Sequence, residues 1–146
     1  RRAGYEAALA GAGLPLDPAL MRSDEMTEHF GYAETRTMLA APNPPTAIMA
    51  ASMIVALGVR RAIEEAGLTM GRDVSVITHD DDLSYLKNGQ DVPIFTAIRS
   101  SVRKAGETLA ECLVDQINAP QDPPRQRMLE AELLVGRSTG PAPHRP

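Results

Sequence analysis

Residues 73–82, DVSVITHDDD, join a short β-branched apolar run directly to a cluster of ionisable side chains. Val74, Val76 and Ile77 give the nearly continuous apolar pattern of a strand buried on both faces, which is typical of a parallel sheet covered by helices. Ligands of such sheets bind beyond the carboxyl ends of the strands, so Asp80 is a candidate binding residue. The alternative is a solvated acidic turn that closes the strand.

The neighbouring segments alternate between strand and helix patterns. Residues 46–50 are a second short apolar run, and Ser52 can cap a helix that reaches about Ala66. Residues 94–98 predict a third strand. Short strands separated by a helix and short connections predict an α/β fold with a doubly wound parallel sheet and right-handed crossovers.

The outer parts of the chain carry helical periodicity and several weaker patterns. Three further helices are predicted over residues 2–12, 27–40 and 100–118, with Thr27 as an N-cap and Gly13 as a left-handed cap. Weaker patterns predict short strands at residues 20–22 and 127–135, a short helix at 83–88, and a Pro-rich tail at 136–146 that is not ordered throughout.

Composition limits the classes of function. The chain has 146 residues, enough for one domain with a core, and 43% hydrophobic and 23% charged residues, as in ordinary water-soluble domains. A net charge of −4 argues against a nucleic-acid-binding surface on this piece. Cys112 lies between Leu109 and Leu113 and is expected to be a small buried hydrophobe.

Neither a membrane span nor a signal-peptide apolar core is found in the sequence, so we expect no membrane association. The chain begins without Met, at an Arg-Arg pair that already belongs to a helical pattern. We therefore expect a fragment of a longer protein. The single cysteine fits a reducing compartment such as the cytoplasm.

Four blocks of the chain, in order and at matching separations, carry a resemblance to one family. They are RRAGYEAALAGAGL, PTAIMAASMIVALGVRRAIEEAGLTMGRDVSVITHDD, PIFTAIRSSVRKAGETLAECLV and LLVGRSTGP. The first resembles an Arg-x-x-Gly-aromatic helix, the second a strand and an Ala-Leu-Gly helix before Gly-aromatic-Asp-Asp, and the last a closing Leu-Val-x-Arg-x-Ser-Thr. Together they resemble the effector-binding domain of the LacI/GalR bacterial transcriptional repressors, over nearly the whole chain.

The resemblance implies the periplasmic-binding-protein-like type I fold, in which two doubly wound α/β subdomains surround a cleft. It implies that residues 1–97 form the C-terminal subdomain without its first strand. Residues 98–135 then form the crossover helix and strand that return to the absent N-terminal subdomain, and residues 136–146 form a tail. With its cover absent, the apolar face of the helix at 100–118 should pair two copies of the chain.

The resemblance also assigns site residues. Asp80 falls on the family acid that binds effector hydroxyls, and Arg1 falls on the arginine of Arg-x-x-Gly, although Arg1 could equally be a free terminal charge. Ser52 replaces the usual Asn. It could contact the ligand, or its role could be that of an N-cap alone. Met26 stands where the family places an aromatic that stacks on sugars, and a thioether has no π-surface. His79 replaces the usual aromatic residue, either as a structural substitution or as a group that tunes binding with pH.

The favoured function is the effector-sensing domain of a transcriptional repressor, with a sugar, polyol or nucleoside-like small molecule as effector and DNA bound only through an absent headpiece. We expect a homodimer that needs no cofactor or metal and catalyses no reaction. The alternative is a periplasmic-type solute-binding protein for a sugar or related molecule. An enzyme that uses the carboxylates of residues 80–82 is a third reading, but the sequence offers no nucleophile-and-base pair and no Gly-rich phosphate loop.

Overall fold

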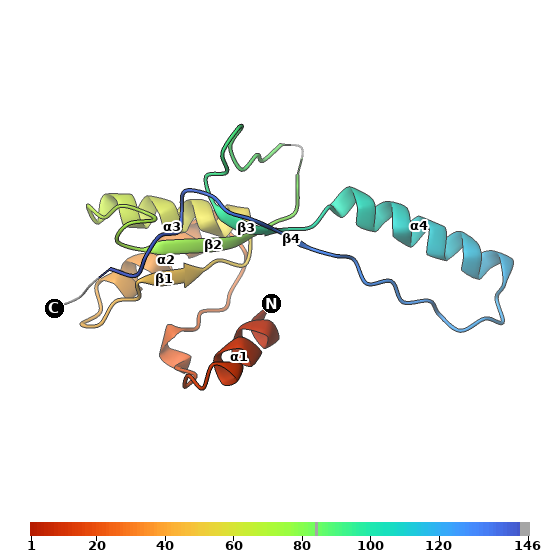
Figure 1. The fold of residues 1–146 in the computed structure, drawn as a ribbon, viewed down its shortest axis with the longest axis horizontal. Coiled ribbons are helices and arrows are strands. Elements are labelled where there is room, and N and C mark those ends of the chain that lie inside the picture. The colour runs from red at the N-terminus through yellow and green to blue at the C-terminus, as the bar shows by residue number, and fades with distance from the viewer. Residues whose placement is uncertain (84, 144–146) are drawn as a thin grey trace.

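The computed structural model describes residues 1–83 and 85–143, and it contains one four-stranded sheet with helices beside it (Figure 1). The helices are α1 (Arg2–Gly11), α2 (Glu28–Leu39), α3 (Met53–Glu65) and α4 (Val102–Asn118), with a short 3₁₀ turn η1 (Pro18–Leu20). The strands are β1 (Ala47–Met49), β2 (Ser75–Asp80), β3 (Thr96–Arg99) and β4 (Glu132–Leu134). The predicted α/β class is confirmed.

The sheet has the order β1-β2-β3-β4. Strands β1, β2 and β3 are parallel, with Ile48 opposite Val76 and Ile77 opposite Thr96, whereas β4 runs antiparallel to β3. Parallel alignment brings the carboxyl ends of β2 and β3 to one edge of the sheet, where Asp80 is paired with Arg99.

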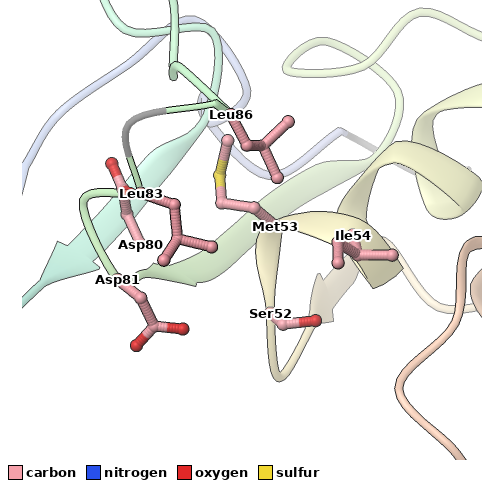
Figure 2. A pocket seen from close by; sticks show the side chains of 7 residues that line it. All are labelled: Ser52, Met53, Ile54, Asp80, Asp81, Leu83 and Leu86. Atoms are coloured by element: carbon pink, nitrogen blue, oxygen red, sulfur yellow. The ribbon is translucent and has the colours of Figure 1, made fainter. Parts of the chain in front are cut away.

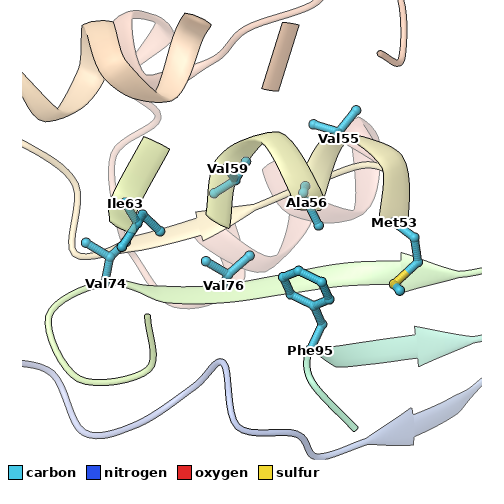
Figure 3. Packing of buried hydrophobic residues seen from close by; sticks show 9 residues of the cluster. Met53, Val55, Ala56, Val59, Ile63, Val74, Val76 and Phe95 are labelled. Carbon is cyan, nitrogen blue, oxygen red and sulfur yellow. The ribbon is translucent and has the colours of Figure 1, made fainter. Parts of the chain in front are cut away.

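The core lies between α3 and the sheet. Val59 and Ile63 of α3 lie over Val74 and Val76, with Phe95 alongside (Figure 3). These five side chains are at most 2% exposed. Each one contributes about 1.5–3 kcal/mol when it leaves water, so this contact is the main source of stability.

Only one face of β2 is buried, so the prediction of a strand buried on both faces was wrong. Val76, Thr78 and Asp80 point toward α3 and are buried, while Ile77 and His79 on the opposite face are half-buried. The reason is that α3 packs on one side of β2. The other side has no comparable cover from α1, which contains no buried residue.

Two glycines allow α2 to pack closely on α3. A Cβ atom on Gly58 would lie 2.0 Å from the carbonyl oxygen of Glu28, and one on Gly31 would lie 2.3 Å from the carbonyl oxygen of Val55. The two helices therefore meet backbone to backbone at both positions, and any side chain there would force them apart.

The sequence patterns located most helix ends correctly. Thr27 caps α2 by accepting a hydrogen bond from the Phe30 amide at 3.1 Å, and Ser52 caps α3. Gly13, just past the end of α1, and Gly67, just past the end of α3, have positive φ angles of 69° and 73°. These are the positions at which short polar caps and left-handed glycines are expected.

Three weaker predictions were not borne out. Residues 20–22 form no strand, because the Asp17 carboxylate caps η1 and Arg22 pairs with Glu34 at 2.7 Å instead. No helix is found at residues 83 and 85–88, where Asn88 is held by the Phe95 backbone; Ser84 lies outside the described residues. The strand expected at 127–135 is limited to β4, where β3 supplies a partner.

Residues 136–140, the first part of the predicted Pro-rich tail, pack tightly across the amino ends of β2 and β3, and residues 144–146 of that tail lie outside the described residues. Ser138 is fully buried. Its carbonyl oxygen accepts from the Val76 amide at 2.7 Å, and its hydroxyl accepts from the Thr96 amide at 2.8 Å while donating to the Val76 carbonyl. A Cβ atom on Gly140 would lie 2.1 Å from the Gly71 carbonyl oxygen, so this segment requires glycine.

Helix α4 extends away from the sheet and buries no residue (Figure 1). Its apolar residues Val102, Leu109, Leu113 and Ile117 are 52–69% exposed. Cys112 is therefore only half-buried, not fully buried as its neighbours suggested. Among the described residues, no helix combines the length and the hydropathy that a membrane span needs.

A carboxylate also stabilises the loop before β2. Asp73 accepts hydrogen bonds from the Thr69 amide at 2.7 Å and from Arg72 at 2.8 Å. The Arg72 hydrogen bond, followed by that of Thr69, holds the pKa of Asp73 below its usual value. The contact therefore stabilises the fold above the ordinary pKa of an aspartate and is lost as the pH falls through the lowered, folded-state pKa.

We predict that Gly58→Ala lowers the free energy of unfolding by about 3 kcal/mol, because the new methyl group collides with the α2 backbone. Urea denaturation measures the change. Gly106→Ala is the matched control, since open space surrounds that position in α4, and it should not destabilise the chain. Equal stability of Gly58→Ala and the unmodified chain would contradict the close contact between α2 and α3.

Candidate functional site

A small pocket lies between the carboxyl end of β2 and the start of α3. It is lined by Ser52, Met53, Ile54, Asp80, Asp81, Leu83 and Leu86, and its volume is about 50 Å³ (Figure 2). Figure 2 shows the Met53 side chain directed toward the two leucines, with the carboxylates nearby. A space of this size holds a few water molecules, which is less room than a sugar-sized ligand occupies.

Asp80 is the last residue of β2 and is only 3% exposed. One carboxylate oxygen accepts a hydrogen bond from the Asp82 amide at 2.9 Å, and the other accepts from Arg99 Nη2 at 3.3 Å. Alternation along the strand sends Asp80 to the same side as Val76, and so toward α3. The carboxylate therefore faces the pocket, at the edge of the sheet that the sequence predicted.

A second polar group forms around Asp81. His79 Nε2 lies 3.0 Å from an Asp81 carboxylate oxygen and 3.0 Å from the Ser100 hydroxyl. The same Asp81 oxygen is 3.8 Å from Arg1 Nη2. Asp81 also lines the pocket, so it connects Arg1 and His79 to the surface formed by Asp80 and Ser52.

Ser52 is an N-cap, as one of its two predicted roles requires, and it also lies beside the pocket. Its hydroxyl accepts from the Val55 amide at 3.4 Å as the N-cap of α3, and the same residue lines the pocket. Met26 does not belong to this group. It lies in the loop before α2, is 57% exposed, and does not line the pocket.

Sequence patterns missed Arg99 and Ser100, which contact Asp80 and His79. The available signal was the end of the strand predicted at residues 94–98, because parallel neighbours of β2 end at the same edge of the sheet. Arg99 Nε is buried and has no hydrogen-bond partner among the described residues, so its guanidinium has an unused donor there.

The chemistry of the site is that of hydrogen bonding to polar ligands. Two carboxylates accept hydrogen bonds, while Arg1, Arg99 and the hydroxyls of serine residues can donate them. In the part of the chain that the structure describes, no group of three or more His, Cys, Asp or Glu residues could hold a metal ion.

Asp82 has a φ angle of 54°, and no other described non-glycine residue has a positive φ. The Asp80 carboxylate holds this turn through the Asp82 amide. We predict that Asp82→Val lowers the free energy of unfolding by about 1–2 kcal/mol, because a β-branched side chain is strained in the left-handed region. Asp82→Gly is the control and should show no loss in urea denaturation. If the two variants were equally stable, the turn would not have this conformation.

Comparison with known proteins identifies the family. Residues 1–139 match the family described as the periplasmic binding protein-like domain. The HTH-type transcriptional regulator AglR of Rhizobium meliloti is 47% identical over 146 residues, covering 99% of this chain and 41% of AglR. CelR of Thermobifida fusca is 30% identical over 138 residues, covering 94% of this chain and 40% of CelR. The chain thus spans about two fifths of the length of these relatives.

Solved structures agree with this assignment. The CelR–cellobiose complex superposes with a TM-score of 0.79 at 31% identity, covering 92% of this chain and 40% of that chain. The Lac repressor bound to ONPG in the repressed state gives a TM-score of 0.81 at 29% identity, covering 95% of this chain and 40% of that chain. With the family match over residues 1–139, these similarities show that the chain belongs to the periplasmic-binding-protein-like domain family, in the form found in LacI-type transcriptional regulators.

Proposed function

We propose that this chain is a C-terminal part of the small-molecule effector-sensing domain of a LacI/GalR-type DNA-binding transcriptional repressor, and that it binds an effector at the carboxyl end of β2. The observation that carries the proposal is the position of Asp80, a buried carboxylate that faces a pocket at the edge of a parallel sheet. Similar folds in the CelR–cellobiose complex and in the Lac repressor bound to ONPG support a sugar-like effector.

The proposed binding residues are Asp80, Arg1, Ser52, His79 and Met26. Four of them are connected by the pocket and by Asp81, and Met26 would join from the loop before α2. The apolar side of the pocket is aliphatic, since Met53, Ile54, Leu83 and Leu86 form it. A sugar, polyol or nucleoside-like effector would therefore be held by hydrogen bonds and aliphatic contact, without an aromatic platform from this pocket.

The pocket of about 50 Å³ requires a second wall. We assign that wall to another subdomain of the intact protein, with residues 1–97 forming one side of the cleft, residues 98–135 returning to the other side, and residues 136–146 as the end of the chain. Effector binding would change the populations of two subdomain arrangements, and so change operator affinity through a separate headpiece. The protein would act in the cytoplasm and would catalyse no reaction.

Asp80→Ala tests this proposal in the full-length regulator with its operator. We expect a roughly 10- to 100-fold weaker effector response, because each hydrogen bond to a charged group contributes about 1.5–3 kcal/mol. Operator affinity without effector should not change. Sugars, polyols and nucleosides are first screened by thermal shift, and operator release is then titrated with those that bind. Asp91→Ala, at an exposed carboxylate in the loop before β3, is the control. An unchanged dose-response would remove Asp80 from the site.

We also propose that the isolated chain forms a homodimer through the exposed apolar face of α4. Leu109, Leu113 and Ile117 are more than half exposed on one helix, and such surfaces pair readily in water. Light scattering after size exclusion at micromolar concentration should give twice the mass of the chain, and Leu113→Lys should give the monomer. Glu111→Lys, at an exposed charged position of α4, should leave the dimer intact. A monomeric profile for the unmodified chain would contradict the proposal.

A further inference from the structure

Helix α4 is attached to the sheet mainly at its start. None of its residues is buried, and in the described part of the chain it packs against no other helix or strand beyond marginal contact. Ser101 caps the helix by accepting from the Lys104 amide at 3.2 Å. The orientation of α4 therefore depends on the residues that join its start to β3, and on residues 119–131, which lead from its end back to β4.

The residues that join α4 to β3 are bonded to the acidic end of β2. We call residues 79–81 and 99–102 together the acid junction. Its contacts are Ser100 N to the Asp80 carbonyl at 3.0 Å, Val102 N to the Asp81 carbonyl at 3.5 Å, His79 Nε2 to Ser100 Oγ at 3.0 Å, and Arg99 Nη2 to the Asp80 carboxylate at 3.3 Å. The junction thus contains two of the candidate binding residues, His79 and Asp80, together with the start of α4.

Arg99 is the charged member of the α4 side of this junction. The Asp80 carboxylate is 4% exposed, and a buried carboxylate needs donors or a cation to offset its loss of water. Among the described residues, its hydrogen-bond donors are the Asp82 amide and Arg99. Without the guanidinium, the carboxylate would have to draw in water at the point where β2 and β3 meet α4.

We propose that Arg99 is a positioning residue that couples the Asp80 carboxylate to the orientation of α4. A ligand hydroxyl or amine that donates to the same carboxylate oxygen competes with Arg99 Nη2, and loss of that bond loosens the acid junction. The ligand-dependent part of this inference rests on the proposed function, whereas the coupling of Asp80 to α4 can be tested without any ligand.

Amide hydrogen exchange on the 146-residue chain measures the coupling. Arg99→Gln should speed exchange of the Ser100 and Val102 amides by about 10-fold, as expected for the loss of one charge-assisted hydrogen bond. Amides of Val59 and Ala62 in α3 should keep their protection. Arg103→Gln is the matched control, because Arg103 is exposed on α4 only four residues further along the chain. Faster exchange at all these amides alike, or at none of them, would overturn the proposal.

A second variant tests the same coupling if Arg99→Gln does not fold. Asp80→Asn keeps an oxygen for the Asp82 amide but removes the charge that Arg99 binds, so it should speed exchange of the same two amides. In the double variant the effects should not add, because both changes break one interaction. Arg99→Lys should restore part of the protection. Unchanged exchange in Asp80→Asn, or additive effects in the double variant, would contradict the coupling.

Ligand screening on the intact regulator, with cellobiose and ribose as the first two sugars, separates this inference from the proposed function. If neither sugar nor any screened ligand binds the intact regulator, the proposed function fails while the exchange result for Arg99 still stands. If cellobiose binds and the response requires Asp80, but protection of the Ser100 and Val102 amides does not change, the proposed function holds and the coupling is wrong.

Discussion

Burial of one side of α3 against β2 is the contact on which the rest of the molecule depends. Val59 and Ile63 cover Val74 and Val76, and all four are nearly inaccessible to water. Because side chains alternate along a strand, this contact also determines where Asp80 points. A carboxylate four residues beyond Val76 has to emerge on the α3 side, next to the N-cap of that helix. The stability of the core and the direction of the candidate binding group thus have one cause.

The other parts of the chain are less well covered than the face of the sheet that packs on α3. Ile77 and His79 face away from α3 and are half-buried, α1 buries nothing, and α4 extends into solvent. The pocket at this edge of the sheet is also small, at about 50 Å³. This one-sided packing is what a chain that spans about two fifths of its relatives would show if further parts of the protein covered these faces.

The Asp80 carboxylate, which we propose as a ligand-binding group, also shapes the chain around it. Asp80 stabilises the left-handed turn at Asp82 and accepts a hydrogen bond from Arg99, which leads into α4. In the proposed site, a ligand that donates a hydrogen bond to Asp80 would compete with these contacts. Such competition is a physical means by which binding at Asp80 would change the orientation of α4. A ligand shifts an equilibrium only through contacts that differ between the two states.

Local sequence was sufficient for features with local causes. Helix caps at Thr27 and Ser52, the left-handed Gly13 and the parallel direction of β1, β2 and β3 follow from side-chain chemistry and apolar spacing, and they were predicted correctly. Features that depend on a distant partner were not. The extent of β4 is set by β3, Ser138 is buried because unpaired amides of β2 and β3 lie beside it, and Arg99 reaches Asp80 only because the strands run in parallel register. Burial of a single face of β2 likewise depends on which helices reach the sheet, and apolar spacing within the strand carries no information about that.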